Sequence, residues 1–270
     1  MWLINTETGD LESVTDPIKG SYAILSHTWE DEEISFQLYR DSRSLAMGLK
    51  GYTKVAKTLE LARSWDLAHA WIDTCCIDKT SSAELSEAIN SMYNWYSNAA
   101  VCFAFLSDIG PVDQDIFHES AQILSNCRWF ARGWTLQELI APDIVEFYDG
   151  QWYCIGNKTD RRIAQAINHI TRIPIALLEK KKPLRSLTIA QRMSWAADRE
   201  TTRTEDIAYS LLGIFDVNMP LLYGEGRKAY TRLLEEICKQ HLSYLAFGIS
   251  RLPQSDTIQR EILRRRNSNH

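Results

Sequence analysis

The chain has 270 residues, of which 30 are lysine or arginine and 35 are aspartate or glutamate, so its formal net charge at pH 7 is −5. This acidic balance argues against a general nucleic-acid-binding protein. No apolar run reaches the roughly eighteen residues that would predict a membrane span. The first ten residues lack the basic and apolar regions of a secretory signal peptide, so we expect a cytoplasmic protein.

The six cysteines do not follow a metal-binding or disulfide pattern. No CxxC pair occurs, and Cys75 and Cys76 are adjacent, which suits neither a tetrahedral zinc site nor an ordinary disulfide. Four of the six lie in apolar or aromatic runs. The sequence therefore predicts reduced, mostly buried thiols and no metal site.

The first half of the chain alternates strand and helix patterns. Short, unbroken apolar runs predict buried strands at about residues 22–25, 69–72, 100–106 and 144–148. Helical spacing predicts a helix at 51–67 and another that begins at a capping box formed by Ser81 and Glu84. This order predicts an α/β fold with a mostly parallel sheet and helices on both faces.

Two turn signals indicate antiparallel strands in this sheet. Residues 1–10 have the pattern of a small hairpin or an edge strand. Asp149-Gly150 separates the strand at 144–148 from a β-type run at 151–155, which is typical of a hairpin. We therefore expect an antiparallel hairpin at an edge of the sheet.

Helical patterns dominate after Gly156. They predict helices at about 160–170, 189–197, 205–215 and 227–241, followed by a short strand at 245–249. We expect one domain at 1–250, with an α/β part at 1–156 and a helical extension at 157–250. Residues 251–270 are polar and basic and are predicted to be a tail or linker.

Polar side chains follow three predicted strands where each strand ends. They are Ser26 and His27, Asp73, and Ser107 with Asp108. Ligands of open α/β sheets bind outside the carboxyl ends of the strands, so these groups should meet at one edge. The sequence therefore predicts a site there.

The stretch RWFARGWTLQEL at 128–139 adds an acid to this edge. If it is helical from about Gly133, then Trp134 and Glu138 share one side, and Leu136, Leu139 and Ile140 lie on the other. Arg132 lies one turn earlier. We expect Glu138 to face a cleft lined by Ser26, His27, Trp29, Asp73, Arg132 and Trp134.

Each residue also has a structural interpretation. Glu138 could be a solvated helix residue or an ion-pair partner of Arg132, and His27 a loop residue used only for hydrogen bonding. Asp73 could cap a loop, and Trp29 and Trp134 could be packing residues. Ser26, His27 and Asp73 do not predict a hydrolase triad, because adjacent side chains cannot easily face each other. The chain has no phosphate loop and no GxGxxG after a strand.

Several blocks resemble the fungal heterokaryon incompatibility (HET) domain. The signature blocks are YAILSHTW at 22–29, WIDTCCID at 71–78 and RGWTLQE at 132–138. Further similar blocks lie at 192–196, 205–215 and 220–226. The resemblance spans about residues 1–248 and is closest to the form fused to STAND-type (NACHT) NTPase and WD-repeat modules. It implies a cell-death effector of non-self recognition that acts by self-association and is controlled by those neighbouring modules.

HET domains are distantly similar to TIR domains, and two stretches carry that similarity here. ILSHTWED at 24–31 resembles the first TIR strand and its end, and WTLQEL at 134–139 resembles the WCxxEL block. In TIR enzymes that cleave NAD the glutamate of this block is catalytic, which implies Glu138 here. The cysteine of the block is Thr135 in this chain, and the helical second half has no TIR counterpart.

Three functions therefore remain open from the sequence. The first is cleavage of NAD at the nicotinamide–ribose bond by Glu138, with NAD as substrate and no further cofactor. The second is a non-enzymatic homotypic scaffold that triggers death through partners. The third is a module that binds NAD or a related nucleotide without turning it over.

Overall fold

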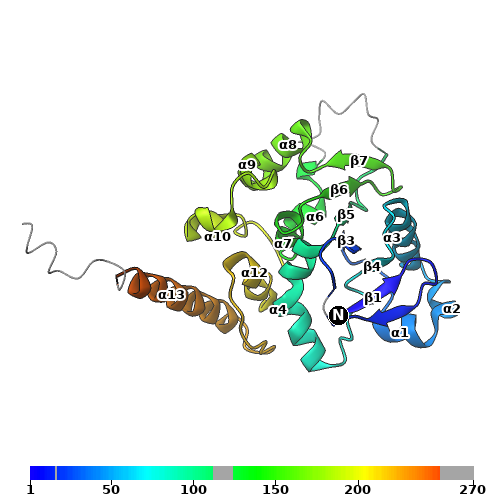
Figure 1. Cartoon of the computed structure of the whole chain (residues 1–270), viewed down its shortest axis with the longest axis horizontal. Coiled ribbons are helices and arrows are strands. Elements are labelled where there is room, and N and C mark those ends of the chain that lie inside the picture. Colours follow the sequence, from blue (N-terminus) through cyan, green and yellow to red (C-terminus); the bar gives the residue numbers. More distant parts are fainter. Residues whose placement is uncertain (16, 112–123, 250–270) are drawn as a thin grey trace, which may run out of the picture.

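The structure is a computed structural model that describes residues 1–15, 17–111 and 124–249, with the backbone alone for 241–249. A seven-stranded sheet lies at its centre, in the order β2-β1-β4-β3-β5-β6-β7 (Figure 1). The strands are β1 (Trp2–Asn5), β2 (Leu11–Ser13), β3 (Tyr22–His27), β4 (His69–Trp71), β5 (Val101–Phe105), β6 (Val145–Tyr148) and β7 (Cys154–Asn157). The predicted α/β class is confirmed.

The middle of the sheet is parallel and its two ends are antiparallel. β3 pairs in parallel with β4 and β5, and β5 pairs in parallel with β6. β1 and β2 form an antiparallel pair at one end, and β6 and β7 form the expected hairpin at the other. β7 begins three residues later than expected, because the Asp149 carboxylate accepts the N–H groups of Gln151 and Tyr153 and lengthens the turn.

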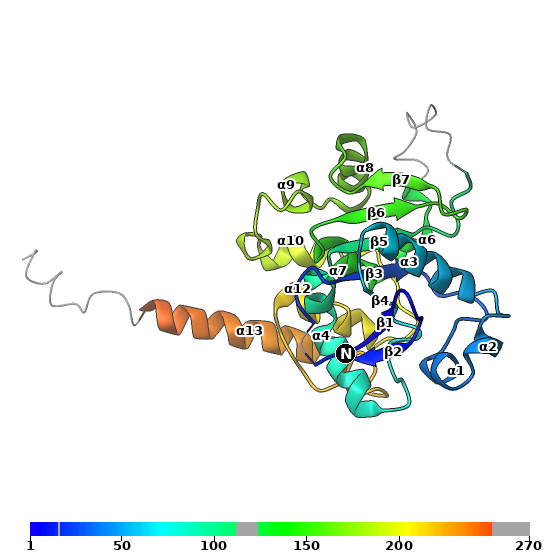
Figure 2. The same cartoon turned by 45° about the vertical axis from the view of Figure 1, so that its right-hand side comes forward.

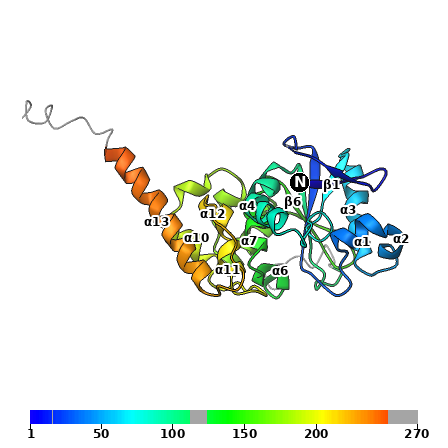
Figure 3. The same ribbon diagram turned by 90° about the horizontal axis from the view of Figure 1, so that it is seen from below.

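Helices cover both faces of the sheet, as Figure 3 shows. α3 (Tyr52–Ser64) contacts β3 and β4 on one face, next to the short helices α1 (Phe36–Asp41) and α2 (Arg43–Ala46). α4 (Ser82–Asn98) and α7 (Thr135–Ile140) lie on the other face, where α7 contacts both α4 and β3. α6 (Arg128–Ala131) leads directly into α7.

The second half of the chain packs against α4 and α7. Its elements are α8 (Arg161–Thr171), α9 (Ile175–Leu178), the 3-10 helix at Leu184–Ser186, α10 (Ile189–Ser194), α11 (Asp206–Tyr209), α12 (Leu212–Phe215) and α13 (Lys228–Ile249). The helix expected at 205–215 is thus divided in two. The strand expected at 245–249 is wrong, because α13 continues through it. α13 is anchored by buried Ala229, Leu233 and Ile237, one helical turn apart, and then projects away from the body (Figure 2).

Four smaller expectations concern a helix cap, the cysteines, membrane spans and the C-terminal tail. The Ser81 hydroxyl accepts the Glu84 N–H group at 3.3 Å, but the Glu84 carboxylate binds the Asp78 N–H group, so only half of a capping box forms. All six cysteines are free thiols, four buried and two exposed. No helix in the described ranges is long and apolar enough to cross a membrane. The tail expected at 251–270 lies outside the described residues.

Candidate active site at the carboxyl ends of the parallel strands

The end of β3 and helix α7 bring a hydroxyl and a carboxylate into direct contact. The Ser26 hydroxyl donates a hydrogen bond to Glu138 Oε2, across 112 positions of sequence. Ser26 is fully buried and the exposed fraction of Glu138 is 6%. The same Ser26 oxygen accepts the indole N–H group of Trp129 at 2.8 Å. This donor fixes the hydroxyl so that its proton points at the acid.

The surroundings of Glu138 favour its protonated form more than water does. Burial raises the pKa of the Glu138 carboxyl to about 7, and the charge of Asp73 adds to the rise. The hydrogen bond from Ser26 and the charge of Arg132 oppose it. In the described residues no basic group lies within ion-pair distance of Glu138, so its expected alternative role as an ion-pair partner of Arg132 does not hold. The carboxyl therefore titrates in the range where a general acid or base is useful.

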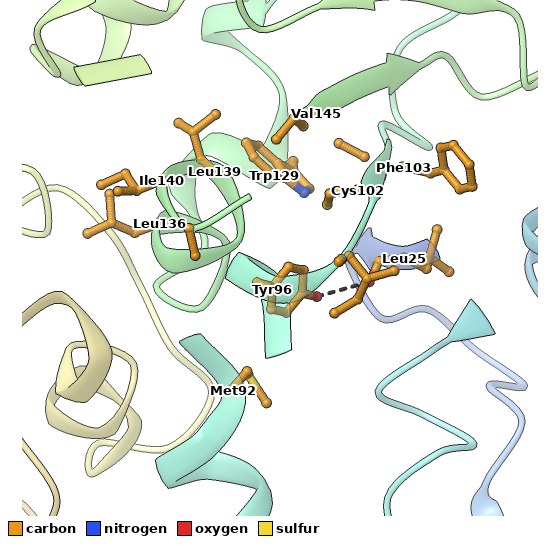
Figure 4. Close-up of a cluster of buried hydrophobic side chains, with 14 of the residues drawn as sticks. Leu25, Met92, Tyr96, Cys102, Phe103, Trp129, Leu136, Leu139, Ile140 and Val145 are labelled. Atoms are coloured by element: carbon orange, nitrogen blue, oxygen red, sulfur yellow. Dashed lines mark hydrogen bonds between the residues drawn. The ribbon is translucent and has the colours of Figure 1, made fainter. Parts of the chain in front are cut away.

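Helix α7 is enclosed on all sides, which differs from the expected two-faced helix. All six of its residues, Thr135 to Ile140, are buried. Figure 4 shows Leu136, Leu139 and Ile140 on this helix, with Tyr96 and Trp129 between it and the strands that carry Leu25 and Cys102. The Glu138 side of the helix meets the end of β3 at Ser26, and α4, α6 and α9 also contact the helix. The spacing of apolar residues in a six-residue helix does not reveal which elements enclose it.

His27, next in sequence to Ser26, points away from Glu138. Its Nε2 atom lies 3.0 Å from Asp73 Oδ1, and its Nδ1 atom lies 3.3 Å from the Lys54 ammonium. Since an ammonium only donates, Nδ1 accepts and Nε2 carries the proton that Asp73 accepts. Both ring nitrogens are thus occupied, and His27 serves as a hydrogen-bonding link. Ser26 and His27 do not form a triad with Asp73, in agreement with the sequence.

The Asp73 carboxylate binds both His27 and Trp29 in the outer part of the site. Its second oxygen accepts the Trp29 indole N–H group at 2.7 Å. Burial alone would raise the pKa of the Asp73 carboxyl, but its hydrogen bond to His27 and the nearby charges of Lys79 and Arg132 hold it well below its usual value. Asp73 is therefore ionised wherever the domain is folded near neutral pH.

The Trp29 ring forms a half-exposed platform above this carboxylate. Its exposed fraction is 43%. The Lys79 ammonium lies 3.7 Å from the ring centroid, and the Arg132 guanidinium carbon lies 5.4 Å from it. Cations over an indole are attracted by its negative face. Trp29, Asp73 and Arg132, all predicted site residues, thus lie together.

A charged pocket opens beside His27. It has a volume of about 240 Å³ and is lined by Glu30, Asp31, Lys50, Gly51 and Lys54. The buried Lys54 ammonium donates to Glu33 and lies 3.2 Å from Glu30 Oε2. The two acids Glu30 and Asp31 balance the two lysines in the lining, so its formal charges cancel. Lys54 connects the pocket to Asp73 through His27.

Trp134 and the Ser107–Asp108 pair, which were also predicted to lie at this edge, bind groups other than Glu138 and Asp73. Trp134 is half-buried and forms a hydrogen bond with Asp206 of α11, so its polar edge faces the second half of the chain. Ser107 donates to Glu30 at 2.8 Å, and Asp108 accepts the Arg128 N–H group at 2.8 Å, so both hold the segment that leads into α6.

Sequence reasoning missed Trp129, which fixes the Ser26 hydroxyl that binds Glu138, and Tyr96, whose hydroxyl donates to the carbonyl of the neighbouring Leu25 at 2.9 Å. Trp129 and Tyr96 were visible only as apolar positions, although an aromatic ring with a polar atom needs a partner when it is buried. Arg199 was also missed: it donates to the Arg132 carbonyl at 2.8 Å and to the Thr135 hydroxyl at 2.9 Å. Thr135, the departure from the TIR block, therefore connects α7 to the second half of the chain. No local pattern points to Arg199.

Comparison with known proteins adds two findings. The model of the family described as "Heterokaryon incompatibility protein (HET)" matches residues 22–120. The chain is 43% identical over 241 residues to vegetative incompatibility protein HET-E-1 of Podospora anserina, an alignment that includes 86% of this chain. The chain spans 17% of the length of that relative. No solved structure matches.

Proposed function

Because this chain carries a fungal heterokaryon incompatibility domain, we propose that it is a cell-death effector of vegetative incompatibility and that it acts by cleaving NAD. The observation that carries the enzymatic part is the buried Glu138, oriented by Ser26 and Trp129 beside the Trp29–Asp73 platform. An acid held in this way at the carboxyl ends of parallel strands is typical of a catalytic group. The TIR-like character of the fold is part of the same proposal.

The proposed reaction breaks the bond between nicotinamide and ribose. Both electrons of that bond pass to the pyridine ring, which leaves as neutral nicotinamide, and the ribose carbon becomes oxocarbenium-like. The ionised Glu138 stabilises this charge. Water then adds to the ribose carbon and gives up one proton, which Glu138 accepts. The leaving ring is already cationic, so one carboxylate suffices.

The outer residues of the site would bind the rest of the nucleotide. Trp29 offers a half-exposed ring for stacking against a base or the nicotinamide. Arg132 offers a guanidinium for the pyrophosphate, and Asp73 an ionised acceptor for ribose hydroxyls. Ser26 and His27 hold Glu138 and Asp73, and Trp134 would line the site from the side of α11.

Control of this activity is proposed to come from outside the domain. Self-association would activate it, and STAND-type NTPase and WD-repeat modules would hold it inactive in a longer protein. The organisation we propose is a HET domain at 1–250, made of the α/β part at 1–156 and the helical part at 157–250, with 251–270 as a linker.

One observation favours a second function, a non-enzymatic scaffold. Only 6% of Glu138 is exposed, so little of the carboxylate meets solvent in this conformation. A scaffold would need the buried acid only for the fold, and death would follow from recruited partners.

The test incubates the purified domain, alone and fused to an inducible oligomerisation module, with NAD. The variants are wild type, Glu138→Gln and the matched control Glu87→Gln, which changes an exposed glutamate on α4. The same forms are expressed in a fungal host to score cell death. NAD loss and death in wild type and Glu87→Gln alone support the enzyme. Death in all three without NAD loss supports the scaffold. NAD binding without turnover would indicate a sensor.

A further inference from the structure

The helix that carries Glu138 is held at both ends by cationic side chains from the second half of the chain. α7 has only six residues, too few to be stable alone. Its position must therefore come from its contacts. Three of these contacts involve Lys158, Lys180 and Arg199. Lys158 directly follows β7, and its N–H group donates to the Val145 carbonyl of β6, whereas Lys180 and Arg199 lie in the helical part of the chain.

Two lysines bind the carbonyl groups at the C-terminal end of α7. The fully buried Lys158 amino group donates to the Leu139 carbonyl at 3.2 Å and also to that of Pro142, and burial lowers its pKa to about 7. The Lys180 ammonium donates to the carbonyls of Ile140 at 2.8 Å and Ala141 at 2.7 Å. The last carbonyls of a helix lack partners within the helix and carry partial negative charge, so ammonium groups suit them.

Arg199 binds the N-terminal end of the same helix. Its guanidinium reaches the Arg132 carbonyl and the Thr135 hydroxyl. The backbone of the following residue reinforces this contact: Gly133 N–H donates to the Glu200 carbonyl at 2.8 Å, and Glu200 N–H donates to the Ala131 carbonyl at 2.7 Å. The charge of Arg199 also interacts with that of Glu138.

We propose that Lys158, Lys180 and Arg199 are positioning residues, through which the second half of the chain sets the place of Glu138 against Ser26. This inference rests on the proposed function, because it assigns the helical second half a role in the same site. None of the three is proposed to touch substrate. The second half would then be part of the active site and not an appendage to an α/β domain.

Substitution of Lys180 gives the clearest test, because the next residue, Lys181, provides a matched control. The Lys180 side chain is 34% exposed, makes the carbonyl contacts and lies 3.5 Å from Asp143 Oδ1, whereas that of Lys181 is 71% exposed and, among the described residues, pairs with Glu179 alone. Lys180→Met and Lys181→Met remove one charge each from the same loop. Arg199→Met, with Arg199→Lys as the conservative variant, tests the other end of α7.

Two readouts are measured on the intact chain. The first is the titration of the Glu138 carboxyl, followed by ¹³C NMR of glutamate-labelled protein and assigned with Glu138→Gln. The second is the rate of nicotinamide release, separated into kcat and KM. Urea unfolding establishes that each variant is folded. The titration does not depend on turnover, so it tests the inference even if the domain proves not to cleave NAD.

The expected result is that Lys180→Met and Arg199→Met lower kcat by about tenfold to a hundredfold with KM within about twofold, as for a misplaced catalytic group. Lys180→Met and Arg199→Met both shift the pKa of Glu138 from its wild-type value. Arg199→Lys has a Glu138 pKa and a kcat close to those of wild type, and Lys181→Met matches wild type in both. If Arg199→Met does not fold, Lys180→Met alone decides. A folded Lys180→Met with wild-type Glu138 titration overturns the inference, whatever its activity.

Discussion

The Ser26 hydroxyl at the end of β3 donates a hydrogen bond to the Glu138 carboxylate on α7. This contact joins the sheet to the helix inside a buried site, and the Trp129 indole fixes its direction by donating to the same hydroxyl. A hydrogen bond to the ionised form lowers a carboxyl pKa, while burial raises it. The pKa of Glu138 is therefore set by two opposing effects, and single substitutions that remove one of them should change it.

Ser26→Ala should raise the pKa of Glu138 further. The substitution removes the donor that stabilises the carboxylate, which is worth about one pH unit. It also leaves the buried Trp129 N–H group without its acceptor, at a cost of about 1–3 kcal/mol in stability. The ¹³C titration of Glu138 checks the shift, with Ser44→Ala on the exposed part of α2 as control. An unchanged titration in Ser26→Ala would mean that the hydroxyl does not bind the acid in solution.

Glu138→Gln should stabilise the domain above neutral pH. The pKa of Glu138 is raised from 4.5 to about 7 in the folded state, so the folded protein binds the extra proton between these values. The free energy of unfolding of wild type therefore falls as pH rises through this window. The amide avoids that loss, which amounts to at most about 3 kcal/mol.

Urea unfolding at pH 5 and pH 8 measures this difference. The gain of Glu138→Gln over wild type should be small at pH 5 and largest at pH 8, and the exposed control Glu87→Gln should show neither effect. If the gain in unfolding free energy of Glu138→Gln over wild type were the same at both pH values, burial of the Glu138 charge would not be what costs stability.

Gly213→Ala should disrupt the packing of α12 against α4. A Cβ atom at Gly213 would lie 2.0 Å from Tyr93 Cβ, far inside van der Waals contact. Overpacking of this kind costs about 3 kcal/mol or more, which outweighs the better helix propensity of alanine. Thermal unfolding checks it, with Gly110→Ala as control, because nothing lies within 4 Å of that Cβ position. Equal stability of the two variants would mean that the second half does not pack on α4 as described.

The sequence was sufficient for the parts of the fold that local patterns determine. Buried strands in a parallel sheet appear as short apolar runs, and the polar residues that end them, such as Ser26 and Asp73, fall at one edge by topology alone. The hairpin after Asp149 followed from turn chemistry. The resemblance of the 132–138 block to known domains singled out Glu138.

The contacts that enclose Glu138 could not be predicted in the same way. Lys158, Lys180 and Arg199 look like ordinary surface cations, because nothing near them in sequence marks a buried partner. Most of their partners on and beside α7 are backbone carbonyls 16 to 67 positions away, which carry no residue signature. The burial of the Glu138 side of α7 could not be predicted for the same reason: the spacing of apolar residues in a six-residue helix does not show which elements enclose it.

The pH dependence of nicotinamide release by the oligomerised domain tests the central claim most directly. If the ionised Glu138 stabilises the developing charge, the rate should rise with pH and reach half its plateau near pH 7, where burial places the pKa of Glu138. Glu138→Gln should abolish the release and Glu87→Gln should leave it unchanged. Release that persists in a folded Glu138→Gln, or that does not change between pH 5.5 and pH 8.5 (roughly 1.5 units on either side of that pKa), would contradict the account.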